Sequence, residues 1–171
     1  MYVLGHVGIS LLLYAPIVAG LLSTKPLLAV LTGILMVGLA PLPDLDTRTQ
    51  RVDHRGPTHT IWFALGVGLL VALVAGVGTV VLGTITGGDS FGGLRLTPLW
   101  MAGWFGGVST LTICGHLVGD LVTPMGIWPF RPLSDWHHTF DLTPSKSPRA
   151  NQFCFGAGMV AVVSTLLVVI L

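Results

Sequence analysis

Five long stretches of the chain contain no acidic or basic side chain, and this feature constrains the fold more than any other. Each stretch is near or above the roughly 18–20 residues that a helix needs to cross a bilayer. Only 9% of the 171 residues are charged, against about 25% in soluble domains. We therefore predict an all-α polytopic membrane helix bundle, a single membrane domain over residues 1–171. The expected transmembrane helices, about five, cover residues 2–22, 26–42, 59–84, 98–122 and 152–171.

The basic residues are distributed unevenly between the two sides of this predicted bundle. One side holds only Lys25 and Arg95. The positive-inside rule therefore places the other side in the cytoplasm, with the N-terminus inside and the C-terminus outside a cytoplasmic (inner) membrane. The lipid bilayer is the expected partner, and the absence of a basic run argues against nucleic acid. The basic residues of the predicted inner side are Arg48, Arg51, Arg55, Arg131, Lys146 and Arg149.

The link 124–151 is the longest connection between predicted helices, and it is rich in proline and tryptophan. Tryptophan gathers at the boundary between lipid and water. We expect this link to lie along the membrane interface, with Trp128 and Trp136 at headgroup depth. We interpret His137 and His138 as interfacial residues too.

Seven potential metal ligands from four separate segments fall on the predicted cytoplasmic side at similar depth. His116 and Asp120 are four positions apart, so they share a helix face about 6 Å apart along the axis. Gly56 and Pro57 block a continuous helix in "HRGPTH", so the chain turns between two histidines. Such groups are costly near hydrocarbon and need partners. The candidate metal ligands are His6, Asp44, Asp46, His54, His59, His116 and Asp120.

The residue types of this set suit a divalent transition metal. Imidazole and carboxylate accommodate Zn, Mn, Fe or Ni. Seven ligands exceed the three protein ligands of one open catalytic zinc, so the set predicts one or two ions, with Asp44 or Asp46 as a bridge. Arg55 and Arg131 are candidate substrate-binding residues, because guanidinium groups hold anionic oxygens. Simpler interpretations stay open: "PDLD" as a helix-ending turn, and His116 with Asp120 as a hydrogen-bonded pair without a metal.

The order and spacing of these segments resemble the YdjM-like membrane-bound metal-dependent hydrolases. The resemblance spans about residues 1–132 and implies an inner-membrane protein with metal-dependent hydrolase activity. The polar pattern of the family maps onto the same seven candidate ligands. The segments that carry the resemblance are "GH" (5–6), "LPDLD" (42–46), "HRGPTHT" (54–60), "GHLVGDLVTPMG" (115–126) and "WPFRP" (128–132).

The first functional hypothesis is a membrane-embedded metal-dependent hydrolase. It would act on a phosphoester or lipid-linked ester of a lipid-like or phosphorylated small substrate, through a metal-bound hydroxide at the cytoplasmic membrane face. Asp46 or Asp120 is the expected catalytic proton acceptor. One alternative is a non-catalytic membrane protein with a closed structural metal site. Another is a small metal or proton transporter, although the outer halves of the predicted helices carry no ionisable residue to continue a path.

Overall fold

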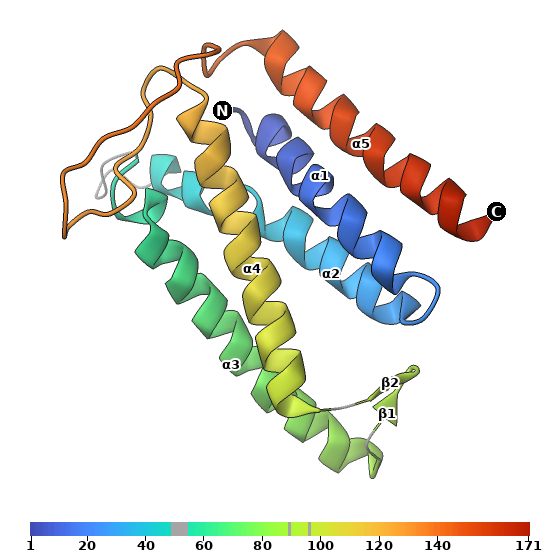
Figure 1. The fold of residues 1–171 in the computed structure, drawn as a ribbon. Coiled ribbons are helices and arrows are strands. Elements are labelled where there is room, and N and C mark those ends of the chain that lie inside the picture. Colours follow the sequence, from blue (N-terminus) through green and yellow to red (C-terminus); the bar gives the residue numbers. More distant parts are fainter. Residues whose placement is uncertain (49–54, 89, 96) are drawn as a thin grey trace.

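The computed structural model describes residues 1–48, 55–88, 90–95 and 97–171 and confirms an all-α bundle (Figure 1). Five helical segments have the length and composition of membrane spans, as the charge-free stretches predict, and the second of them continues past its α-helix to Asp46. Very little of the described chain is strand. The helices are α1 (Val3–Leu21), α2 (Pro26–Leu39), α3 (Ile61–Thr86), α4 (Pro98–Leu121) and α5 (Pro148–Ile170).

The observed helix boundaries differ from the expected ones by a few residues, and local chemistry explains why. Helix α2 ends at Leu39, and the chain continues through two prolines into the 3₁₀ helix η1 (Pro43–Arg48). Helix α5 begins at Pro148, before the expected residue 152. The Ser147 side chain accepts a hydrogen bond from the backbone N–H of Ala150 and so caps this helix.

The helices form two closely packed pairs, α1 with α5 and α3 with α4, and α2 packs against α1 and α4 (Figure 1). Glycines permit these close approaches. A Cβ on Gly106 of α4 would lie 2.8 Å from the carbonyl oxygen of Gly68 on α3. Small residues are the usual device for packing membrane helices. The buried face of α2, with Leu28, Ala29 and Met36, fills the core beside α1 and α4.

Apolar side chains cover the outer faces of α3 and α5. Leu69 and Ile85 on α3 are 74% and 76% exposed, and Val168 on α5 is 81% exposed. In a bilayer these surfaces face lipid tails or other helices, so their exposure carries no penalty. The fold therefore has the surface of a membrane protein rather than that of a soluble bundle.

One end of the bundle gathers most of the polar features (Figure 1). The N-terminus, η1, the 3₁₀ helix η2 (Pro57–His59) and the ends of α4 and α5 that flank the long loop all meet there. The opposite end carries a small hairpin of β1 (Ser90–Phe91) and β2 (Leu94–Arg95). The fold thus brings every described candidate ligand to the same end.

Candidate metal centre

Four segments contribute side chains to one buried cluster of imidazoles and carboxylates. Helix α1 supplies His6 from its first turns, and α4 supplies His116 and Asp120 from its last turns. The 3₁₀ helices η1 and η2 supply Asp44 and His59. Four of these five residues are at most 1% exposed, and Asp44 alone is partly open.

The ligand atoms lie at similar separations from one another. Single donor atoms of His6, Asp44, His116 and Asp120 all lie within 4.8 Å of each other. The Nε2 atom of His59 lies 3.2 Å from Asp120 Oδ2, 3.5 Å from Asp44 Oδ1 and 3.3 Å from His116 Nε2. The Nε2 atom of His6 lies 3.6 Å from both Asp44 Oδ2 and Asp120 Oδ1. These five residues therefore surround a common point.

Hydrogen bonds outside the cluster fix how two of the rings present their nitrogens. The Nδ1 atom of His116 lies 2.8 Å from the Ala40 carbonyl oxygen, which can only accept a hydrogen bond. The Nδ1–H of His116 is therefore the donor, and its Nε2 atom faces the cluster. The Nδ1 atom of His59 lies 3.0 Å from Thr58 Oγ1, which itself donates to Asp46 Oδ2 at 2.7 Å. Such outer partners orient histidines that bind metals.

Two buried polar atoms of the cluster have no hydrogen-bond partner among the described residues. They are the two ring nitrogens of His6. A buried polar group left in this state costs about 1–3 kcal/mol. Most of the donor separations are longer than a hydrogen bond, but donors about 2.0–2.1 Å from a tetrahedral Zn²⁺ lie roughly 3.3–3.4 Å apart. The residues present therefore fit a divalent cation.

The ring of His6 lies flat on the ring of His116, with centroids 3.6 Å apart and planes 12° apart. This contact needs α1 and α4 to approach closely. A Cβ on Gly119 would lie 3.1 Å from His6 Nδ1, and one on Gly115 would lie 2.6 Å from Leu13 Cδ1. The two glycines of "GHLVGD" thus provide the space in which the histidines stack.

Two positively charged groups contact Asp120 in addition to the imidazoles. Its Oδ1 atom accepts hydrogen bonds from the Met1 amino group at 2.6 Å and from Arg55 Nη2 at 3.0 Å. Arg55 also donates to Thr123 Oγ1 and the Gly126 carbonyl oxygen. Its backbone has φ +63°, a conformation that non-glycine residues seldom adopt. These bonds and that of its N–H to Asp46 Oδ2 hold the turn.

The electrostatics of His59 favour its charged form. Burial lowers the pKa of this imidazole, but hydrogen bonds and attraction from Asp120 and Asp44, with the charge of Asp46, outweigh burial and leave the pKa raised above 6.5. Opposite charges a few ångströms away act in this direction. A cation bound to His59 must therefore displace a proton.

Of the two remaining predicted ligands, Asp46 contacts the cluster through His59, and His54 is not described. Asp46 lies on the far side of His59, with Oδ2 3.3 Å from His59 Nδ1. Its described contacts make it a partner of the ligand rather than a neighbour of the common point. His54 lies outside the described residues, so its predicted role as a ligand remains a prediction.

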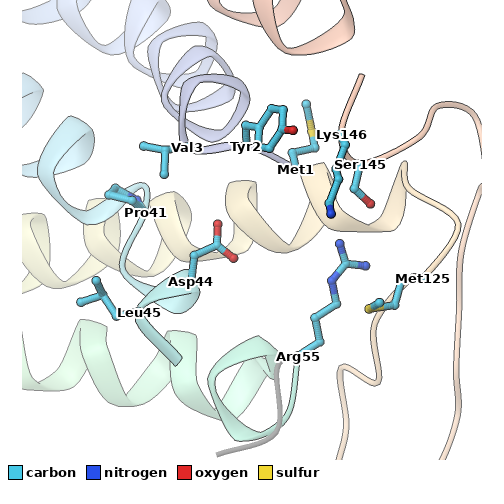
Figure 2. Close-up of a pocket in the computed structure, with 10 residues that line it drawn as sticks. All are labelled: Met1, Tyr2, Val3, Pro41, Asp44, Leu45, Arg55, Met125, Ser145 and Lys146. Carbon is cyan, nitrogen blue, oxygen red and sulfur yellow. The ribbon is translucent and has the colours of Figure 1, made fainter. Parts of the chain in front are cut away.

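A pocket of about 550 Å³ opens beside the cluster, and Asp44 and Arg55 line it (Figure 2). Lys146, from the loop before α5, also lines this pocket. Lys146 was not among the predicted site residues. It belongs to a loop that returns to the end bearing the ligands, and this position is the sequence signal that could have identified it.

The other predicted substrate-binding residue, Arg131, lines a different pocket. Its Nε atom lies 3.0 Å from Asp135 Oδ1, and its guanidinium lies 4.8 Å from the centre of the Trp128 ring. The surrounding pocket, of about 780 Å³, also reaches Arg55 and Trp62. Arg131 is therefore not among the residues that line the pocket beside the cluster.

The comparisons with known proteins agree with this architecture. The family model described as YdjM inner membrane protein matches residues 1–171, which extends the similarity beyond residue 132 to the last loop and helix. Neither the curated proteins nor the solved structures include a significant match. The match over the whole chain, with the five apolar helices, makes this a multi-pass inner-membrane protein. The chain belongs to the YdjM inner membrane protein family.

Proposed function

We propose that the protein is a metal-dependent hydrolase that cleaves a phosphoester at the cytoplasmic face of the inner membrane. The observation that carries this proposal is the gathering of three imidazoles and two carboxylates around one point beside an open pocket. A purely structural site needs a closed shell of ligands. Here Asp44 belongs to the cluster and also lines the pocket, so a substrate has access to it.

Five side chains would hold the cation. They are His6, Asp44, His59, His116 and Asp120, all of which offer donor atoms that suit Zn, Mn, Fe or Ni. When bound, a divalent cation there supplies Lewis acidity, which activates water and stabilises charge on the oxygens of a phosphoester. One divalent ion would neutralise the charge of the two carboxylates in this set.

The positions of the side chains assign the remaining roles in the proposed reaction. Asp44 is the carboxylate that faces the pocket, so it is the group best placed to accept a proton from the attacking water. This role passes to Asp44 because Asp46 lies behind His59 and Asp120 Oδ1 is held by Arg55 and Met1. Arg55 fixes Asp120 and adds positive charge where negative charge develops on the substrate.

The proposed orientation follows from the basic residues. The end with the cluster carries Arg55, Lys146 and most other basic side chains of the loops, and the opposite end carries Lys25 and Arg95. Lys and Arg are retained on the cytoplasmic side of membrane proteins. A substrate that reaches this pocket therefore comes from the cytoplasm or the inner leaflet.

The test uses the full chain purified in detergent. Bound metal is measured by mass spectrometry, and hydrolysis of a phosphoester panel is compared for wild type, His59→Ala and the control His137→Ala, which removes an exposed imidazole of the long loop. Metal in the wild type, with metal-dependent turnover that only His59→Ala abolishes, is the expected result. Metal that stabilises the protein without turnover of any substrate points to a structural site. Metal flux into liposomes without turnover points to transport.

A further inference from the structure

The pocket beside the cluster has two chemically different sides (Figure 2). Val3, Pro41 and Leu45 form an apolar side, and Arg55 and Lys146 point toward each other on the opposite side. The carboxylate of Asp44 points into the space between them. The pocket therefore matches an amphiphilic molecule whose anionic group and apolar chain lie on either side of Asp44.

The positive charge around this pocket exceeds the negative charge, although Arg55 itself is paired with Asp120. Among the described residues, Lys146 forms no ion pair with a carboxylate. Arg55 is 4% exposed, and its Nε atom has no hydrogen-bond partner within the described chain. A divalent cation would balance Asp44 and Asp120, and the Met1 amino group offsets the charge of Asp46. Arg55 and Lys146 then leave two positive charges in excess. A dianionic ligand would neutralise them.

Hydrogen bonds from one buried side chain fix the loop that carries Lys146. Asn151 of α5 is 2% exposed, and its Nδ2 donates to the carbonyl oxygens of Ser145 and Ser147, on either side of Lys146. Its Oδ1 accepts from the backbone N–H of Tyr2 at 2.9 Å. One buried amide thus ties the loop to the start of α1. This arrangement preorganises Lys146 at the pocket, which reduces the entropic cost of binding.

We propose that this pocket binds a lipid phosphomonoester, with the phosphate group between Arg55 and Lys146 and the apolar chain along Val3, Pro41 and Leu45. The inference rests on the proposed function and names its substrate class. In the corresponding reaction a water oxygen bonds to phosphorus, the bond between phosphorus and the lipid oxygen breaks, and inorganic phosphate and a lipid alcohol leave. Asp44 takes one proton of the attacking water, and this proton passes through solvent to the departing lipid oxygen, which leaves as an alcohol.

The test measures binding, so that it stands apart from turnover. Calorimetry on the detergent-purified full chain compares three probes: dihexanoylphosphatidic acid, dihexanoylphosphatidylcholine and inorganic phosphate. We expect phosphatidic acid to bind at least about tenfold more tightly than either other probe. We expect Lys146→Ala to weaken it about tenfold, the loss typical of one charge-assisted hydrogen bond. Arg149→Ala removes an exposed cation nearby that does not line the pocket, and it serves as the matched control, within about twofold of wild type.

A second variant examines the apolar side. Leu45→Asn should weaken phosphatidic acid severalfold and leave inorganic phosphate unchanged, since burial of apolar surface contributes roughly 25 cal/mol per Å². Equal binding of all three probes, or wild-type binding by Lys146→Ala, would overturn the inference. Lysine-dependent binding without hydrolysis leaves the lipid phosphate site standing and removes the hydrolase proposal. Hydrolysis that does not depend on Lys146 leaves the hydrolase proposal standing and removes the lipid phosphate site.

Discussion

The two ends of the helix bundle differ in how deeply their ionisable side chains are buried. At the end that carries the N-terminus, His6, His116 and Asp120 are buried, and some of their polar atoms have no described partner. At the other end, Lys25 and Arg95 are exposed, and Lys25 lies 4.8 Å from the centre of the Trp100 ring. Buried polar groups persist only where something offsets their loss of water. The difference shows that only the first end has a buried group of side chains that could hold a metal ion, among the described residues.

The largest expected effect comes from a change that removes a ligand but preserves packing. His6→Phe keeps a ring against His116 and removes two ring nitrogens that have no described hydrogen-bond partner. We expect metal affinity to fall by more than about 100-fold, because the loss of a supporting residue alone costs roughly 10–100-fold in affinity. The melting temperature of the chelated protein should not fall, since no described hydrogen bond is lost. If His6→Phe binds as much metal as the wild type, His6 is not a ligand and the proposed difference between the two ends is wrong.

The next effect concerns the carboxylate behind His59. Asp46→Asn keeps the shape of the side chain but removes the charge near His59 Nδ1, 3.3 Å away. We expect metal affinity to fall roughly 10–100-fold, as is usual for the partners of metal ligands. Competition with a fluorescent chelator measures this affinity. Asp135→Asn at the surface is the control, and a loss of equal size in both variants would argue against a specific role for Asp46.

Metal affinity should also depend on pH in a defined direction. The raised pKa of His59 means that the metal-free imidazole holds a proton at and somewhat above pH 6.5. A cation must displace this proton, so apparent affinity is constant above the raised pKa and falls by up to about tenfold per pH unit below it. Chelator competition from pH 8.5 to 5.5 measures the trend. A flat profile would mean that His59 is not a ligand.

The smallest effect is expected at the opposite end. Lys25→Ala removes an exposed cation–π contact that contributes about 0.5–1 kcal/mol. We expect metal content and turnover to stay within about twofold of wild type, with a melting temperature lowered by a few degrees at most. A large loss of metal in Lys25→Ala would contradict this expectation and show that the two ends are coupled.

Much of the fold follows from the sequence, because the bilayer imposes a simple rule. A charge-free stretch of sufficient length must become a helix in lipid, and each of the five stretches does. The same rule brings the segments bearing the ligands to one end, since alternate links lie on the same side. The spacing of His116 and Asp120 on one helix turn also needs no tertiary information.

The finer assignments depended on packing that the sequence does not encode locally. Asp44 and Asp46 are both acids of one short turn, and only the position of His59 separates the one at the cluster from the one behind it. Lys146 reaches the pocket because Asn151 ties its loop to the start of α1. The ion pair of Arg131 with Asp135 likewise becomes visible only in three dimensions.

The most direct test of the account is the position of a metal in crystals of the full chain. X-ray data collected on either side of the absorption edge of the metal found by mass spectrometry give an anomalous difference map. The account predicts a peak bonded to His6, His59 and His116 with at least one of Asp44 and Asp120, facing the pocket of Lys146. Protein from metal-replete cells with no peak there, or with a peak only on surface histidines such as His137, would contradict it.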